Sequence, residues 1–183
     1  RQTIFGMFPS LQSSNKLINL QFIAILMAEE QKAVEEWRKE KDKYFMYDFD
    51  SPIPHEARHE FKGLLYYPYD PKFRVKATIK MVKSDEIIQM VTSKDTNQPY
   101  RKFGYLEFTL DGKQYKLAVY KRAWVHENDP HLFIPFRDAT SGKETYGAGR
   151  YIDIEESKQY VIDFNMAYNP FCVYNENYSC PIP

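Results

Sequence analysis

The sequence predicts a mainly β (α+β) domain, an antiparallel barrel or sandwich with one N-terminal helix. Residues 73–81 alternate between apolar and polar side chains, which is typical of a strand with one buried face. Asp111-Gly112 lies between two strand-like runs, and this dipeptide favours the turn whose twist matches a β-hairpin. Residues 28–47 contain neither glycine nor proline and show a helical pattern. These three observations together define the fold class.

The helix over 28–47 has acidic residues in its first turn and basic residues later, which suits the helix dipole. One stripe of this helix is expected to pack against the rest of the domain, and its members are Val34, Trp37, Lys41 and either Tyr44 or Phe45. Two prolines in the stretch 50–54 end the helix, because proline cannot continue it.

Beyond the helix, the pattern predicts short strands separated by turns. The expected strands are 73–81, 86–92, the hairpin 103–121, 131–136 and 158–164. Residues 84–86 are expected to form a hairpin turn, and the proline in 96–99 is expected to break the chain again.

The length of 183 residues suits one domain. We assign 27–183 to a single β domain and 1–26 to a leader or a non-native extension. The apolar run at 16–28 is interrupted by polar residues and is too short to span a bilayer. Two interpretations stay open. A signal-peptide core at 16–28 implies a secreted or organellar protein, whereas a start at Met27 implies a cytoplasmic one.

Charge and motifs exclude several classes of partner. The chain has 25 basic and 25 acidic residues, so bulk charge implies neither nucleic acid nor an anionic membrane surface. No basic run is interleaved with aromatic residues as expected of an RNA-binding domain. The glycine-containing stretch 135–153 is neither a P-loop nor G-x-G-x-x-G, and we expect no cofactor.

His55, Glu56 and His59 match H-E-x-x-H, the zinc peptidase pattern in which two histidines bind the metal and the glutamate acts as general base. That chemistry needs a longer helix and a third ligand further along the chain. Prolines and a glycine flank this stretch, and the later His126 and His131 lie in a loop-like region. We therefore interpret the match as coincidental and predict no metal site.

Two polar stretches are the candidate ligand site, at 138–150 and 163–169. Asp138 suits a turn that accepts backbone hydrogen bonds, and Arg150 offers a bidentate fork for a carboxylate or phosphate. The predicted ligand-binding residues are Thr140, Ser141, Thr145, Arg150, Asn165 and Asn169. The alternative is structural, with Arg150 paired internally to Asp138 or Asp163.

Cys172 and Cys180 are separated by seven residues. Three interpretations remain open for this redox or structural pair: a disulfide that closes a short loop, two ligands of an incomplete metal site, or two buried free thiols. The disulfide is expected in an oxidising compartment and the free thiols in the cytosol.

Several long segments resemble one family. They begin with "VEEWRKEKDKYF" and continue through "FKGLLYYPYDPKFRV" and "GYLEFTLDG" to "LFIPFRDATSGKETYGAGRYID" and "VIDFNMAYNPFCVYNENYSCPIP". Over roughly 34–183 the chain resembles the DUF1684 proteins, a family of unknown function found mainly in bacteria and archaea. The resemblance places weight on the polar stretches and on both cysteines, but not on His55 and His59. It implies no reaction.

Three functions compete. The preferred one is binding of a small anionic molecule at 138–150 and 163–169. The second is a hydrolase or transferase, with Asp138 or Asp163 as general base, Tyr146 as acid and Arg150 as oxyanion support. The third is a structural or assembly role, in which the helix at 28–47 binds a protein partner.

Overall fold

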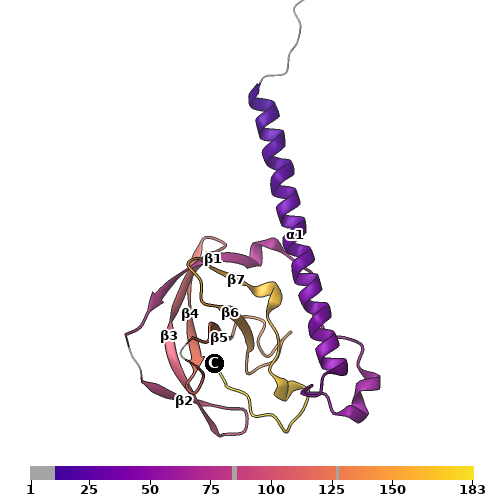
Figure 1. The fold of residues 1–183 in the computed structure, drawn as a ribbon, viewed down its shortest axis with the longest axis vertical. Helices are drawn as coiled ribbons and strands as arrows, with labels where there is room; N and C mark the ends of the chain where they lie inside the picture. The colour runs from indigo at the N-terminus through magenta and orange to yellow at the C-terminus, as the bar shows by residue number, and fades with distance from the viewer. Residues whose placement is uncertain (1–10, 84–85, 127) are drawn as a thin grey trace, which may run out of the picture.

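The computed structural model describes residues 11–83, 86–126 and 128–183. A long helix, α1 (Leu11–Tyr47), lies beside a seven-stranded antiparallel sheet that curves into a nearly closed barrel (Figure 1). The predicted fold class is confirmed, and of the two predicted architectures the sheet forms the barrel. The expected hairpin turn at 84–86 falls largely outside the described residues.

The sheet has the order β6-β5-β4-β3-β1-β7, and β2 also pairs with β3. The strands are β1 (Arg74–Met81), β2 (Ile87–Val91), β3 (Asn97–Leu110), β4 (Lys113–Arg122), β5 (His131–Phe136), β6 (Arg150–Glu155) and β7 (Tyr160–Asp163). Four short 3-10 helices complete the fold: η1 (His55–Glu60), η2 (Pro71–Phe73), η3 (Phe164–Met166) and η4 (Phe171–Val173).

The barrel closes between β6 and the chain that follows β7. Tyr151 and Tyr168 exchange two backbone hydrogen bonds, of 2.9 and 3.0 Å, and form an antiparallel bridge. This bridge joins the two ends of the strand order, so few backbone groups remain as an open sheet edge there.

The turn at Asp111-Gly112 is confirmed, since both residues have positive φ, 49° and 74°. This is the conformation that a two-residue hairpin turn between twisted strands requires. The break predicted at 96–99 is wrong. Pro99 lies inside β3 opposite Gln89 of β2, and its carbonyl accepts a hydrogen bond from Ala123 just past the end of β4. Because β4 ends at this point, the sheet does not need a backbone N–H donor at Pro99.

The barrel interior is filled by the alternate side chains of the strands. Its most deeply buried members are Leu106, Val119, Leu132, Ile134, Ile152 and Ile162. The outward face of β5 and β6 is buried as well, under the C-terminal segment (residues 164–183). Phe133 and Tyr151 pack there with Met90, Tyr100 and Cys180. Burial on both faces explains why 131–136 is an almost continuous apolar run.

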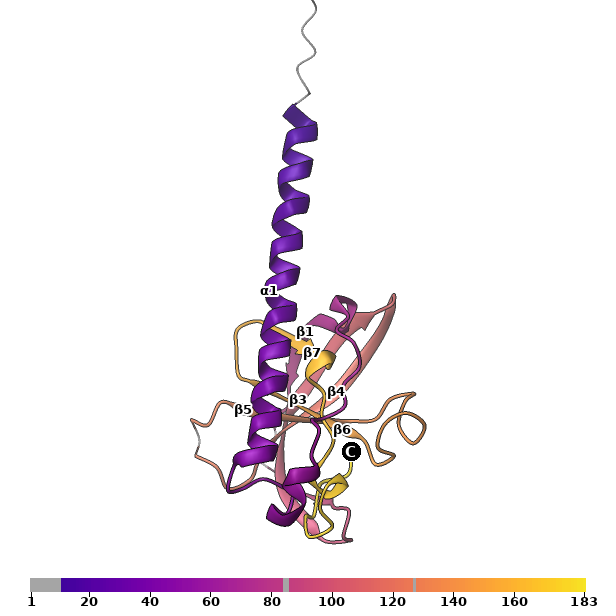
Figure 2. The same ribbon diagram turned by 90° about the vertical axis from the view of Figure 1, so that its right-hand side faces the viewer.

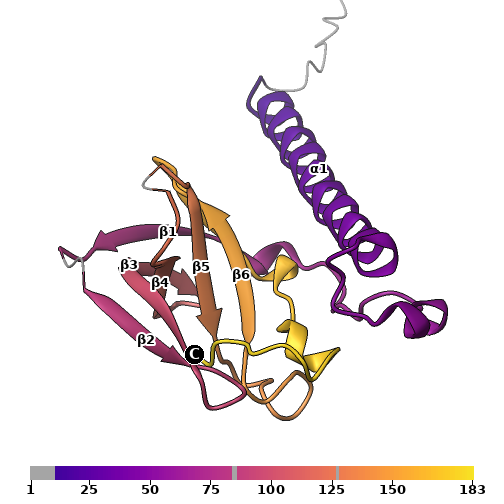
Figure 3. The same ribbon diagram turned by 60° about the horizontal axis from the view of Figure 1, so that its bottom comes forward.

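The C-terminal segment is tied to the turn after β2. Ser93 donates a backbone hydrogen bond to the carbonyl of Cys180 at 2.8 Å, and the Cys180 amide donates to Ser93 Oγ at 3.1 Å. Ile182 donates to Val91 at 2.8 Å. Figure 3 shows this end of the chain beside β2 and the lower end of β5.

Helix α1 begins at Leu11, well before the predicted residue 28, and runs without interruption through Met27. Its second half packs beside the barrel, whereas its first half projects beyond it (Figures 1 and 2). In the packed half Val34 and Phe45 are buried and Trp37 and Lys41 are half-buried, so the predicted stripe is confirmed. The division of the chain at residues 26 and 27 stays a prediction. In the part that the structure describes, no helix combines the length and apolarity needed to cross a membrane.

Candidate functional site beside Cys172

The loop between β5 and β6, residues 137–149, holds three of the six predicted ligand residues, Thr140, Ser141 and Thr145. Its polar groups bond to one another. Asp138 Oδ1 accepts from the Thr140 amide at 2.9 Å and from Thr140 Oγ1 at 2.5 Å. The Oγ1 atoms of Thr140 and Thr145 are hydrogen-bonded at 2.9 Å, and Ser141 Oγ accepts from the Asp138 amide at 3.1 Å. The predicted loop side chains therefore hold the loop in shape.

Arg150 lies at the first position of β6, not in the loop as the sequence indicated. Its Nη2 atom donates to Asp138 Oδ2 at 2.6 Å, and its side chain is only 13% exposed. Partial burial opposes ionisation of Asp138, but hydrogen bonds from Thr140 and Arg150 outweigh it and lower the pKa of this carboxyl. An ionised carboxylate paired in this way is a poor general base.

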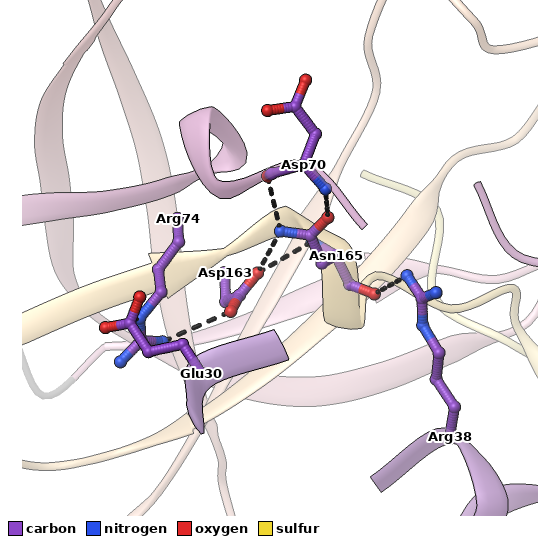
Figure 4. Close-up of polar contacts among 6 residues, drawn as sticks. All are labelled: Glu30, Arg38, Asp70, Arg74, Asp163 and Asn165. Carbon is purple, nitrogen blue, oxygen red and sulfur yellow. Dashed lines mark hydrogen bonds and ion pairs between the residues drawn. The ribbon is translucent and has the colours of Figure 1, made fainter. Parts of the chain in front are cut away.

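The second polar stretch builds a different network, between the barrel and α1 (Figure 4). Buried Asn165 accepts from the Asp70 amide at 2.9 Å and donates to the Asp70 carbonyl at 3.0 Å and to Asp163 at 2.8 Å. Asp163, which is 4% exposed, also pairs with Arg74 at 3.3 Å. From α1, Glu30 pairs with Arg74 at 3.0 Å and Arg38 donates to the Asn165 carbonyl at 2.8 Å.

This junction has unused hydrogen-bonding groups as well. Among the described residues, four buried side-chain atoms have no hydrogen-bond partner: Arg38 Nε, Tyr66 Oη, Tyr69 Oη and Asn169 Oδ1. Burial raises the pKa of Tyr66 well above its usual value, so its hydroxyl stays protonated. Asn169, one of the predicted ligand residues, therefore has a buried acceptor without a donor.

A pocket of about 430 Å³ lies where three segments meet, and we name it the Cys172 pocket. The turn after β2 contributes Ser93 and Lys94, and the 137–149 loop contributes Tyr146. The C-terminal segment contributes Cys172, Glu176, Asn177 and Tyr178. Of the predicted site residues, Tyr146 and Cys172 reach this pocket. The sequence pattern did not predict the other five, because only the pairing of residues 91–93 with 180–182 brings these segments together.

The two cysteines are free thiols in contact, one at the pocket wall and one behind it. Cys172 is half-buried, whereas Cys180 is 8% exposed. The Cys172 amide donates to Cys180 Sγ at 3.3 Å, and Cys172 Sγ donates to Tyr146 Oη at 3.9 Å. Burial, together with the neighbouring Cys172 thiol, raises the pKa of Cys180 to about 11. Cys180 is therefore protonated at neutral pH and is the less reactive member of the pair.

His55, Glu56 and His59 are exposed in the 3-10 helix η1. A 3-10 helix has about three residues per turn, so side chains at i and i+4 point in different directions. Within the described ranges no group of three or more His, Cys, Asp and Glu side chains is arranged to hold a metal ion. That the H-E-x-x-H match is coincidental stays a prediction, which this geometry supports.

His131 of β5 pairs with Asp153 of β6 at 2.9 Å, and Tyr168 also donates to this carboxylate. The hydrogen bond to Asp153 raises the pKa of His131 above its usual value of 6.5.

A raised folded-state pKa stabilises the fold below the unfolded-state pKa, and this contribution is lost as pH rises through the folded-state value. The free energy of unfolding is therefore expected to fall between about pH 6 and 8, and to fall by more in the parent than in His131→Gln. The two decreases are expected to differ by less than about 1 kcal/mol, because solvent screens the ion pair. Urea unfolding at several pH values measures it, and parallel pH profiles would contradict the assignment.

A family model described as "Protein of unknown function (DUF1684)" matches residues 59–183, more than half of the chain. The chain belongs to the DUF1684 family. The predicted family is thus confirmed, and the matched region contains the whole barrel, the Cys172 pocket and both cysteines. The DUF1684 match begins after the end of α1, so the whole helix lies outside it.

Among solved structures, this DUF1684 chain is similar to the solution NMR structure of an uncharacterized protein of Haloarcula marismortui. The sequence identity is 36% and the TM-score is 0.68, over 86% of this chain and 87% of that one. No curated protein matches the chain. These comparisons show the family and the fold.

Proposed function

We propose that this protein binds a small molecule with an anionic group in the Cys172 pocket. The observation that carries the proposal is the pocket itself, whose volume of about 430 Å³ falls in the range of small-molecule sites. It lies between the turn after β2 and the C-terminal segment, where loops on a rigid barrel meet.

The donors around the pocket favour an anion. Lys94 contributes a cationic ammonium group with three donors, and Ser93, Tyr146 and Tyr178 contribute hydroxyls. Burial, together with the neighbouring Cys172 thiol, raises the pKa of Tyr146, so its hydroxyl is protonated at neutral pH. Glu176 also lines the pocket, and its carboxylate disfavours a second anionic group but accepts a hydrogen bond from a ligand donor. A monoanion that also carries a hydroxyl or amino group fits this combination.

This site adjoins the predicted one. The 137–149 loop supplies Tyr146, while Asp138, Thr140, Thr145 and Arg150 hold that loop from behind. Because Arg150 already donates to Asp138, Lys94 is the more available anchor for a ligand anion. Direct binding by Arg150 or Asn165 stays a prediction.

The test is a thermal-shift screen of small carboxylates and phosphate esters, followed by calorimetry of any hit. Loss of one charge-assisted contact is expected to weaken binding roughly tenfold or more in Lys94→Gln. Lys143→Gln is the matched control, because Lys143 is an exposed lysine of the 137–149 loop that does not line the pocket. Equal weakening in both variants, or no hit in the screen, would contradict the proposal.

The enzyme alternative has less support. Asp138 and Asp163 belong to two separate networks, and each carboxylate already accepts hydrogen bonds from protein groups. Of the predicted catalytic residues, Tyr146 alone lines the pocket.

One observation favours the assembly alternative. The projecting half of α1 exposes a row of large apolar side chains, each 43–60% exposed: Leu20, Phe22, Ile23, Ile25 and Leu26. Within 28–47 the apolar stripe is already packed on the barrel, so self-association through 20–26 is the form of assembly that the exposure favours. Light scattering of the full chain tests it, and a monomer at high concentration would contradict it.

A further inference from the structure

The two thiols are placed for chemistry with each other. Cys172 lies in η4 and Cys180 precedes the C-terminal prolines, yet their side chains are in contact and the Cys172 amide donates to Cys180 Sγ at 3.3 Å. Both positions are fixed by the fold. Cys180 is bonded on both sides to Ser93, and Phe171 packs on Phe45 of α1. The contact between the thiols is therefore a property of the folded domain.

The two thiols differ in access to solvent. Cys172 lines the Cys172 pocket with Lys94 and Tyr146, whereas Cys180 is buried with Phe133 and Tyr151 on the outward face of β5 and β6. A buried thiol in apolar surroundings forms a thiolate less readily than one that solvent reaches. The sulfur of Cys172 is therefore accessible from the pocket, whereas the sulfur of Cys180 is shielded and lies in contact with Cys172.

We propose that Cys172 and Cys180 form a thiol–disulfide exchange site that reacts with a low-molecular-weight disulfide entering the Cys172 pocket. Cys172 loses its proton to solvent, and its thiolate attacks one sulfur of the disulfide. The S–S bond of the small molecule breaks, and one thiol leaves as a thiolate that takes up a proton. The product is a mixed disulfide at Cys172.

Cys180 then completes the exchange. It loses its proton and attacks Sγ of Cys172, and the second small thiol leaves and is protonated. In total, the protein dithiol is oxidised to one intramolecular disulfide, and one small disulfide is reduced to two thiols. The reverse reaction with an excess of small thiol restores the dithiol, because exchange is an equilibrium.

The bond has a structural consequence. It closes a ring over residues 172–180, which contains Glu176 and Tyr178 of the pocket wall. Cross-linking reduces the freedom of such a segment. Oxidation therefore fixes one wall of the pocket, although the exchange chemistry itself does not depend on the proposed ligand.

The experiment exposes the reduced full chain to oxidised glutathione and follows its intact mass with time. The chain has two cysteines, so every change in mass is assigned to this pair. The parent is expected to lose the mass of two hydrogen atoms. Cys180→Ser is expected to keep one glutathionyl group on Cys172, because the sulfur that would displace it is absent.

Cys172→Ser is the matched control, since it keeps only the buried thiol. It is expected to react at least about tenfold more slowly than Cys180→Ser in the native state, and to react readily in denaturant. Circular dichroism verifies that both variants are folded. A parent that accumulates glutathionyl groups without ring closure, a native parent that does not react, or equal rates in the two variants would each overturn the proposal. Since no pocket ligand is used, these outcomes are independent of the ligand screen.

Discussion

Replacing Phe45 by alanine is expected to destabilise the protein by about 3–5 kcal/mol, the range for a fully buried phenylalanine. Phe45 is 1% exposed in the last turns of α1. Its ring lies 5.0 Å from that of Tyr174, 5.8 Å from Phe171 and 6.0 Å from Phe61. The substitution leaves a cavity where the helix, η1 and the C-terminal segment meet, and these neighbours cannot close it without moving the backbone.

Urea unfolding measures this change, and the chain offers a close control. Phe49 lies four residues further on and is 97% exposed, so Phe49→Ala should alter the free energy of unfolding by less than about 0.5 kcal/mol. Similar losses in both variants would show that Phe45 does not anchor the helix. Because Phe171 and Tyr174 flank Cys172, the Phe45 variant should also expose Cys180 to alkylation faster than the parent.

Local pattern predicted much of this fold. The buried stripe of α1, the alternating strand at 74–81 and the turn at Asp111-Gly112 each depend on residues close together in the sequence. Periodicity and backbone preference suffice for such features. The course of α1 upstream of residue 28 was not predicted, because Asn19, Gln21 and the apolar side chains around them face solvent there and show no amphipathic pattern.

The features that the sequence did not predict depend on pairing between segments far apart in the chain. The sequence pattern predicts a polar loop where β6 lies, because Arg150 and Asp153 are charged. In the structure the backbone of β6 pairs with β5 on one side and with Tyr168 on the other. Pro99 looked like a break, and only the position of Ala123 shows why it is tolerated. The pocket depends on the same kind of pairing, so sequence spacing alone predicted two of its residues, Tyr146 and Cys172.

The two predicted polar stretches show where sequence alone is ambiguous. The sequence predicts a ligand site that includes Asp138, Arg150, Asp163 and Asn165, and the structure shows these residues bonded to each other or to α1. The sequence does not distinguish a polar side chain that binds a ligand from one that hydrogen-bonds to buried backbone groups, since both require the same donors and acceptors. Asn165 is the clearest example, and its substitution measures what the junction contributes.

Asn165→Ala is expected to lower the free energy of unfolding by roughly 2–4 kcal/mol. The amide side chain satisfies both the N–H and the C=O of Asp70 and donates to Asp163. Alanine leaves the N–H and the C=O of Asp70 without this partner in a half-buried place and removes one of the donors to Asp163, which keeps the amide at 165 and Arg74. The cost of an unmade hydrogen bond there exceeds the modest net gain of making one. Arg38 still reaches the backbone carbonyl at 165, so the loss reports the side chain itself.

Asn128→Ala is the control, because Asn128 is exposed and its change should stay within about 0.5 kcal/mol. Hydrogen exchange adds the second measurement. If the Asn165 network fastens the chain before β1 to the start of η3, amides around Asp70 and Asn165 should exchange faster in the variant, whereas those of the β3–β4 hairpin should change only with global stability. Equal stability of the two variants would mean that the Asn165 side chain does not stabilise this junction, because the contacts of α1 through Arg38 and Glu30 remain in both. The measured difference therefore gives the contribution of the Asn165 side chain to the junction.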